Sequence, residues 1–150
     1  MIDLYRTEHQ QPFFHFEDAN SPVSSPAIEY FQESIGKADE LVFIFPYWWG
    51  GMPAIMKNFI DWNFSKGFAF EYVNSRPRGL LVGKEVKVIT TTGAPELIYR
   101  FTGANRRLKK TIEQQIARFC GMKMTAFKSF GGVDTRSKKI QSILDAVAHM

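Results

Sequence analysis

Three consecutive aromatic residues, Tyr47, Trp48 and Trp49, follow an apolar run that ends in a proline. A turn made of these residues must expose some of its rings, and large rings can form a wall for a flat ligand. The same rings can instead pack as an apolar plug on the helix that follows. The residues alone leave both interpretations open.

A second segment suited to ligand contact comes after a later apolar run. Thr91, Thr92, Gly93 and Ala94 are small, so their backbone N–H groups can closely approach the carbonyl and nitrogen edge of a ring. The phenol of Tyr99, a few residues further on, can donate a hydrogen bond to a reduced oxygen. Considered alone, the segment is more simply a turn after a strand, and Tyr99 a half-buried residue.

Both segments stand at the ends of apolar runs that are typical of strands buried on two faces. We predict four strands of a parallel sheet, at Met1–Tyr5, Leu41–Phe45, Val86–Thr91 and Met124–Phe130. Helical patterns between the strands predict an α/β fold in three layers. Ligands of such folds bind at the carboxyl ends of the strands, where both segments lie.

Helix signals separate the predicted strands. Ser25 and Pro26 are a typical N-cap and first residue, and that helix is expected to end between Gly36 and Asp39. Apolar residues at helical spacing predict three more helices, which we expect at 53–67, 108–119 and 140–147. The residues from 67 to 83, and those between Pro95 and the third helix, are predicted to be irregular.

The bulk properties fit one globular domain covering residues 1–150. The chain has 150 residues, of which 45% are hydrophobic, with no repeat and no linker. Its formal net charge is +4, and its basic residues crowd the second half. No nucleic-acid-binding motif accompanies them, so solvated helix faces are the favoured explanation and no nucleic-acid partner is predicted.

Cys120 is the only cysteine, so no internal disulfide can form, and its place in an apolar stripe predicts a buried thiol. No apolar run approaches the length of a membrane helix, so no membrane insertion is predicted. No signal peptide is apparent, and a reducing cytoplasm is expected. No metal site is predicted.

The spacing of these features becomes specific when they are taken together. Residues 38–57, with the sequence ADELVFIFPYWWGGMPAIMK, closely resemble the NAD(P)H:quinone oxidoreductase (DT-diaphorase) and bacterial modulator-of-drug-activity family. Residues 67–72, 91–93 and Tyr99 match later segments of that family in the same order, and residues 3–5 match its second strand. The resemblance covers nearly the whole chain and implies a flavodoxin-like fold.

The resemblance also implies a flavin cofactor, FMN or FAD, with NAD(P)H as the co-substrate and a quinone-type acceptor. Hydride would pass from the nicotinamide to the flavin and then to the quinone. Tyr99 would stabilise charge during this transfer. One edge of the flavin ring would lie against Pro46, Tyr47, Trp48, Trp49 and Gly50. Its pyrimidine edge would lie against Thr91, Thr92, Gly93 and Ala94.

Two further residues take a role from the resemblance. Phe70 and Tyr72 would cover the substrate pocket, which in this family is usually that of the other subunit in a homodimer. Asn105 stands where the mammalian enzymes place a histidine, and an amide cannot exchange a proton near neutral pH. Asn105 either takes a catalytic position without a proton relay or caps a helix beginning at Arg106, and capping is favoured.

The chain departs from the family in one larger respect. The family's first strand and its phosphate-binding loop have no counterpart, so the sheet is expected to be N-terminally shortened. In the strand order 2-1-3-4-5 that first strand is interior. The chain could be a shortened product that still folds, the strand Met1–Tyr5 could move over to Leu41–Phe45, or a second chain could supply the pairing.

Three functions remain open at this stage. The first is a flavin-dependent quinone reductase. The second is a relic that keeps the fold but has lost the flavin. The third is an accessory subunit, because some relatives dock on potassium-efflux channels.

Overall fold

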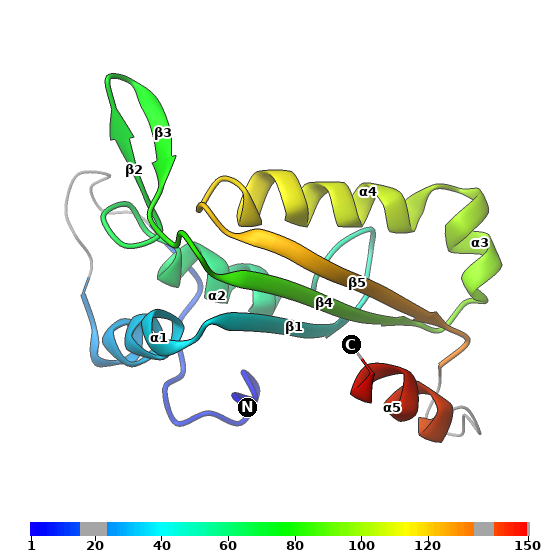
Figure 1. Ribbon diagram of the computed structural model, residues 1–150. Helices are drawn as coiled ribbons and strands as arrows, with labels where there is room; N and C mark the ends of the chain where they lie inside the picture. Colours follow the sequence, from blue (N-terminus) through cyan, green and yellow to red (C-terminus); the bar gives the residue numbers. More distant parts are fainter. Residues whose placement is uncertain (16–23, 134–139, 150) are drawn as a thin grey trace.

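The computed structural model describes residues 1–15, 24–133 and 140–149. Three parallel strands, β1 (Glu40–Pro46), β4 (Glu85–Thr92) and β5 (Lys123–Gly131), form a sheet in the order β1-β4-β5 (Figure 1). An antiparallel hairpin of β2 (Phe70–Val73) and β3 (Arg76–Gly79) stands out from the sheet. The α/β class with a parallel sheet is therefore confirmed, and three of the four predicted strands are present.

The helices are α1 (Pro26–Lys37), α2 (Ala54–Asn63), α3 (Glu96–Phe101), α4 (Ala104–Thr111) and α5 (Ile140–Ala148), and a π-helical segment, Ile112–Ala117, continues α4. The Ser25 side chain accepts a hydrogen bond from the backbone N–H of Ile28, so the predicted start of α1 is confirmed. The second predicted helix ends at Asn63 rather than near Gly67. The hairpin and α3 occupy stretches that were expected to be irregular.

The predicted strand at Met1–Tyr5 is wrong. Residues at this end form turns, in which the Asp3 side chain accepts from the backbone N–H of Tyr5 at 3.0 Å and the Asp3 carbonyl accepts from Thr7 at 2.9 Å. A short polar side chain offers the backbone this local alternative to a ladder. Because no strand forms here, the idea that Met1–Tyr5 moves over to pair with β1 is wrong as well.

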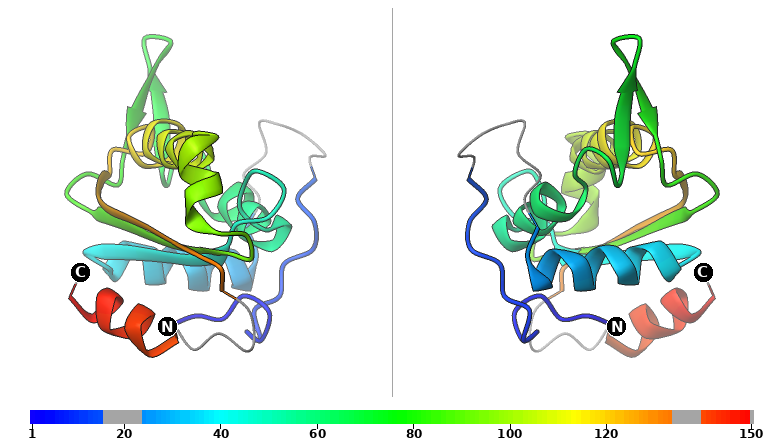
Figure 2. Two further views of the ribbon diagram at one scale, coloured as in Figure 1. Left: turned by 90° about the vertical axis from the view of Figure 1, so that its right-hand side faces the viewer. Right: turned by 90° about the vertical axis from the view of Figure 1, so that its left-hand side faces the viewer.

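The core lies on one face of the sheet. Alternation along the strands places Phe43 and Phe45 on the same face as Val86 and Val88. These residues form one buried cluster with the inner faces of α2 and α4, which contribute Met56, Ile60 and Leu108. Figure 2 shows α4 on one side of the sheet and α5 on the other.

Cys120 lies in this core with only 3% of its surface exposed, which confirms the prediction of a buried thiol. Burial raises its pKa to about 11. None of the helices in the described parts of the chain is long and apolar enough to cross a membrane.

Candidate functional site

The two predicted ligand-contact segments lie side by side at the carboxyl ends of the strands. Pro46, the last residue of β1, is in register with Thr91 of β4, and the backbone N–H of Tyr47 donates to the Thr91 carbonyl at 2.8 Å. Strand pairing thus extends one residue beyond β1 and fixes the first segment against the second. The expectation that a parallel sheet brings both segments to one edge is correct.

The aromatic segment folds into a tight turn. The backbone N–H groups of Trp48 and Gly51 each donate to the carbonyl of the other residue, at 3.1 and 2.9 Å. The two central residues have positive φ, 48° at Trp49 and 84° at Gly50, as in a type I′ turn. Glycine adopts this conformation readily, whereas for a tryptophan it is uncommon and strained. The turn carries the Trp49 ring fully into solvent and leaves the Trp48 ring 54% exposed.

Tyr47 points the other way. Its side chain is buried, its hydroxyl donates to the Ala104 carbonyl at 3.4 Å, and its ring lies 5.1 Å from that of Tyr99. Burial raises the pKa of the phenol, and the nearby Arg107 lowers it to a smaller extent. Tyr47 is therefore the apolar plug, whereas Trp48 and Trp49 are exposed, and their contact with a flat ligand stays a prediction.

The second segment is braced by neighbouring loops. The Thr92 hydroxyl donates to the Ala94 carbonyl at 2.8 Å. The backbone N–H groups of Gly132 and Val133, which follow β5, donate to the carbonyls of Ala94 and Thr92, each at 2.9 Å. These contacts fix the shape of residues 92–94 from two sides.

Several backbone donors at this edge have no acceptor among the described residues. The N–H groups of Trp49, Gly50, Gly93 and Ala94 donate to no other described residue. Free N–H groups beside exposed aromatic rings can receive the carbonyl oxygens and ring nitrogens of a flat heterocycle. The residues present therefore fit the ring of a flavin.

The described residues fit the flavin ring, but they do not provide a comparable site for the flavin phosphate. Phosphate groups are commonly held by a loop of small residues that joins a strand to the N-terminus of a helix. On the open side of β1 the described residues form no such strand, loop and helix. The described parts of the chain therefore fit the ring but offer no cradle of this kind for its phosphate.

Tyr99 and Asn105 lie close to this edge on two different helices. Tyr99, on α3, packs against the core through its contact with Tyr47. Asn105 lies inside the first turn of α4, which begins at Ala104 after Gly103, and its Oδ1 accepts from the Ser129 hydroxyl at 3.2 Å. The expectation that Asn105 caps a helix is wrong, because Gly103, with φ of 70°, holds the cap position.

Phe70 and Tyr72 lie at the opposite end of the sheet. The hairpin that carries them is joined to the core by the backbone N–H of Leu81, which donates to the Cys120 carbonyl at 2.9 Å just before β5 begins. The Phe70 ring packs against Phe119, with ring centres 4.8 Å apart, while the Tyr72 side chain is 54% exposed. Within one chain, these two residues are not brought together with the two predicted ligand-contact segments.

Sequence reasoning missed an apolar surface on α3. Leu97, Ile98 and Phe101 are all exposed, and Phe101 most of all at 86%. They belong to the helix that directly follows the second predicted ligand-contact segment. Their helical spacing was the signal that could have revealed them, but the flanking Pro95 and the short length of α3 obscured it. This surface extends the exposed apolar area of the carboxyl edge.

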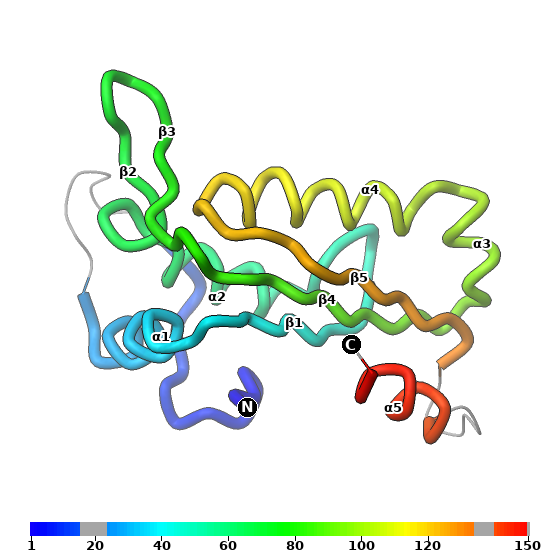
Figure 3. The backbone as a smooth tube through the Cα atoms, viewed as in Figure 1, coloured from blue at the N-terminus to red at the C-terminus, as the bar shows by residue number. Residues whose placement is uncertain are grey.

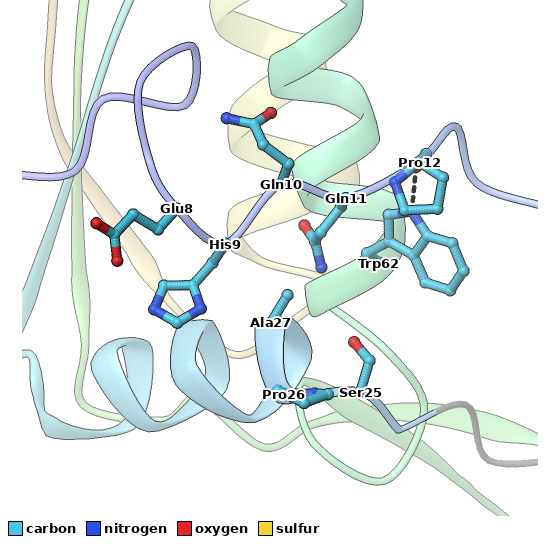
Figure 4. A pocket seen from close by; sticks show the side chains of 9 residues that line it. All are labelled: Glu8, His9, Gln10, Gln11, Pro12, Ser25, Pro26, Ala27 and Trp62. Atoms are coloured by element: carbon cyan, nitrogen blue, oxygen red, sulfur yellow. Dashed lines mark hydrogen bonds between the residues drawn. The ribbon is translucent and has the colours of Figure 1, made fainter.

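A hollow of about 350 Å³ lies elsewhere, between residues 8–12, the start of α1 and Trp62 (Figure 4). None of the predicted site residues lines it. Its wall is held by the indole N–H of Trp62, which donates to the Pro12 carbonyl at 2.7 Å. The amide of Asn58 donates to the same carbonyl at 2.9 Å. These bonds attach the loop to α2, which is a structural role.

Comparisons with known proteins agree with this geometry. The chain is 29% identical over 142 residues to a protein of Haemophilus influenzae named as an uncharacterized NAD(P)H oxidoreductase, covering 91% of this chain and 70% of that protein. It is 35% identical over 98 residues to human ribosyldihydronicotinamide dehydrogenase [quinone], covering 63% of this chain and 42% of the human protein. A solved NAD(P)H:quinone oxidoreductase from Methanothermobacter marburgensis superposes with a TM-score of 0.72 at 26% identity, covering 87% of this chain and 63% of that one.

The chain thus spans less than two thirds of the human relative and of the archaeal structure. The family model described as the flavodoxin-like fold matches residues 1–150. The predicted resemblance is confirmed, and the chain belongs to the flavodoxin-like family.

Proposed function

We propose that this chain carries the ring-binding part of a flavin-dependent NAD(P)H:quinone oxidoreductase. The observation that carries the proposal is the carboxyl edge of the sheet, where two exposed tryptophans stand beside four backbone donors that have no acceptor in the described parts of the chain. The human and archaeal relatives are named as quinone-reducing enzymes, which supports the same activity here. A shorter match is named as FMN-dependent, so FMN is the preferred cofactor and FAD the second choice.

In this proposal both segments hold the flavin ring. Trp48 and Trp49 lie against one edge of the ring, and the turn from Pro46 to Gly50 keeps them there. The N–H groups of Gly93 and Ala94 donate to the pyrimidine edge, with Thr91 and Thr92 fixing the backbone that presents them. Such rigid donors would stabilise negative charge on a bound ring without rearrangement.

A bound flavin would supply the chemistry of hydride transfer between NAD(P)H and the quinone. The phenol of Tyr99 would donate a hydrogen bond to an oxygen of the bound ring or of the quinone. Asn105, held by the Ser129 hydroxyl, orients polar groups beside Tyr99 and exchanges no proton. Exposed apolar side chains of α3 keep water away from the acceptor.

The proposal includes a homodimer in the cytoplasm. Phe70 and Tyr72 lie on the hairpin at the far end of the sheet, so they cannot cover the site of their own chain. A two-fold symmetric dimer, with the two sheets running in opposite directions, would bring Phe70 of the partner subunit over the ring. A single buried thiol suits a reducing compartment.

The experiment is a titration of the purified chain with FMN and with riboflavin, followed by flavin and tryptophan fluorescence. Because the described residues fit the ring and not the phosphate, we expect the two affinities to differ by less than about tenfold, which corresponds to ~1.4 kcal/mol. Trp49→Ala should weaken both ligands while leaving the unfolding free energy within ~0.5 kcal/mol of wild type.

The matched control is Trp62→Phe, whose site lies on α2 away from the carboxyl edge. It should leave flavin affinity unchanged. A folded wild-type chain that binds neither FMN nor riboflavin contradicts the proposal. That result favours the alternative that the chain is a relic, which keeps the fold but has lost the flavin. Flavin-dependent reduction of benzoquinone by NADPH rules the relic out.

A further inference from the structure

Helix α3 turns its apolar face to solvent. Leu97, Ile98 and Phe101 are 60%, 52% and 86% exposed. Helical spacing places these three side chains on one face, and Tyr99 lies on the opposite face, packed against the core. A helix on the outside of a domain normally buries its apolar face. This face therefore lacks a partner among the described residues.

Basic side chains lie beside this apolar face. Residues 96–111 contain five arginine or lysine residues and one acidic residue, Glu96. Arg100 on α3 and Arg106 in the first turn of α4 are both exposed. Neither takes part in an ion pair with another described residue. Positive charge therefore dominates the corner where α3 meets α4.

The outward face of α4 is basic as well. Arg106, Lys109 and Lys110 are exposed and lie within about one turn, while Ala104 and Leu108 occupy the buried face. Like charges at this spacing repel one another and weaken a helix. In the described parts of the chain, no carboxylate pairs with these three cations. An anionic surface lying over this face would relieve the repulsion.

The two features are neighbours in space. Figures 1 and 3 show α3 at the end of the sheet where the strands finish, with α4 running back from it over the sheet. Only residues 102 and 103 separate the two helices. Exposed leucine and phenylalanine next to arginine and lysine is the composition of segments that lie in the interface of a membrane. There the apolar groups enter the headgroup layer and the cations meet anionic lipids.

A second copy of the chain fits this surface less well. Symmetric dimers use the same patch on both subunits. A contact centred on Phe101 would bring Arg100 and Arg106 of one copy toward the same residues of the other, and like charges repel. An anionic lipid surface has the opposite charge and needs no matching shape. A nucleic acid has that charge too, but its phosphates offer no apolar layer to Leu97 and Phe101.

We propose that α3 and the basic face of α4 dock the chain on the surface of a membrane that contains anionic lipids. Leu97, Ile98 and Phe101 enter the headgroup layer, and Arg106 and Lys110 meet the lipid phosphates. The contact is peripheral, because it uses the side chains of two surface helices. It does not rest on the proposed flavin chemistry, so either proposal can fail without the other.

The experiment is co-sedimentation of the whole chain with protein-free vesicles. One set contains phosphatidylcholine and phosphatidylglycerol in equal parts, and the other contains phosphatidylcholine alone. We expect binding to the first set and about tenfold weaker binding to the second. Raising the ionic strength from about 0.1 M to about 1 M shortens the screening length from ~10 to ~3 Å, and should release most of the bound chain.

Two double variants test which charges matter. Arg106→Gln with Lys110→Gln removes two positive charges from α4 and should weaken binding to the anionic vesicles about tenfold. Arg76→Gln with Lys123→Gln is the matched control, since it removes one arginine and one lysine at the other end of the sheet. The control should stay within about twofold of wild type. All four side chains are exposed, so urea unfolding should be the same for both double variants.

A pair of tryptophan reporters tests the apolar contact. Phe101→Trp and Tyr72→Trp each change an exposed aromatic residue, and the two positions lie at opposite ends of the sheet. Brominated phosphatidylcholine in the anionic vesicles quenches tryptophan that enters the lipid. We expect it to quench the fluorescence added by Phe101→Trp and to leave that added by Tyr72→Trp unchanged.

Several results would overturn the proposal. A wild-type chain that does not bind the anionic vesicles is one, and equal binding by the two double variants is another. Equal quenching of the two reporters also contradicts it. Self-association that Phe101→Ser abolishes would identify a second copy as the occupant instead, and binding of double-stranded DNA in place of vesicles would identify a nucleic acid.

Discussion

The rings of Tyr47 and Tyr99 lie 5.1 Å apart and are inclined at 59°, which joins the two loops at the carboxyl end of the sheet. Tyr47 follows β1, and Tyr99 belongs to the helix that follows β4. Inclined aromatic pairs at this separation are favourable beyond the area they bury. Since the next residue, Trp48, begins the exposed turn, this buried contact sets where the turn stands relative to Gly93.

The first prediction concerns Tyr47. Tyr47→Phe removes a hydroxyl whose hydrogen bond to Ala104 is long, at 3.4 Å, so the unfolding free energy should fall by less than ~1 kcal/mol. Tyr47→Ala removes the buried ring and should cost ~3 kcal/mol or more. Urea unfolding measures both. Equal losses for the two variants would show that the hydroxyl, and not ring packing, joins the loops.

The sequence predicted the central part of the fold because that part depends on local patterns. Continuous apolar runs identified β1, β4 and β5, and Ser25 with Pro26 marked the start of α1. The failure at Met1–Tyr5 has a physical cause. A strand needs a neighbour to satisfy its backbone, and without one the Asp3 carboxylate binds the chain in a turn.

The hairpin escaped prediction for another reason. β2 and β3 are short, and their turn places two ordinary residues, Asn74 and Ser75, at φ of 51° and 62°. Asn is among the residues that tolerate this conformation, but the pair lacks the glycine that usually signals such a turn. Glu71 and Arg78 form an ion pair across the strands, a contact that only the pairing itself reveals.

In the candidate site, the sequence predicted which loops meet but not which way their side chains point. Nothing in the run of three aromatic residues shows that Tyr47 turns inward while Trp49 turns outward. That division follows from the hydrogen bond between Tyr47 and Thr91 and from positive φ at two residues. Likewise, Asn105 was misplaced because Gly103 begins α4 earlier than its apolar stripe suggests.

The second prediction uses a pair of glycines at the carboxyl edge. A Cβ atom on Gly131 would stand 2.2 Å from the backbone nitrogen of Glu96, so Gly131→Ala must displace the start of α3. We expect a loss of ~1–3 kcal/mol in unfolding free energy. Gly93→Ala is the control, because nothing lies within 4 Å of its Cβ position, and it should stay within ~0.5 kcal/mol of wild type.

Hydrogen exchange at Gly132 gives a second readout for this pair. Its backbone N–H donates to Ala94 across the same contact, so exchange should be faster in Gly131→Ala and unchanged in Gly93→Ala. If both variants kept wild-type stability and wild-type hydrogen exchange, the close approach of β5 to α3 would play no part in fixing residues 92–94.

The third prediction is a pH dependence that arises from Cys120. Its pKa rises from 9.0 to about 11 in the folded chain, because burial disfavours the thiolate. Above the lower value the unfolded thiol ionises while the folded thiol stays neutral, so ionisation favours the unfolded state. The contribution of the neutral Cys120 thiol to the unfolding free energy is fully present below about pH 8. It falls by ~1.4 kcal/mol per pH unit between the two pKa values.

The matched variant is Cys120→Ala, which keeps a small apolar group and removes the titration. The difference in unfolding free energy between wild type and this variant should change by ~2 kcal/mol between neutral pH and pH about 11. Guanidinium unfolding across that range measures it, with the same protein concentration throughout. A difference that does not change with pH would mean that the folded thiol ionises as readily as the unfolded one.

The last prediction compares two buried threonines on one face of β4. The Thr90 hydroxyl has no hydrogen-bond partner among the described residues, whereas the Thr92 hydroxyl donates to the Ala94 carbonyl at 2.8 Å. Valine has nearly the same shape, so each substitution tests the hydroxyl alone. Thr90→Val should raise the unfolding free energy by ~1 kcal/mol because an unpaired buried polar group is removed, and Thr92→Val should lower it by ~1 kcal/mol. Thermal and urea unfolding of both variants measure these changes in unfolding free energy. A Thr90→Val protein less stable than wild type would show that a buried water satisfies the Thr90 hydroxyl.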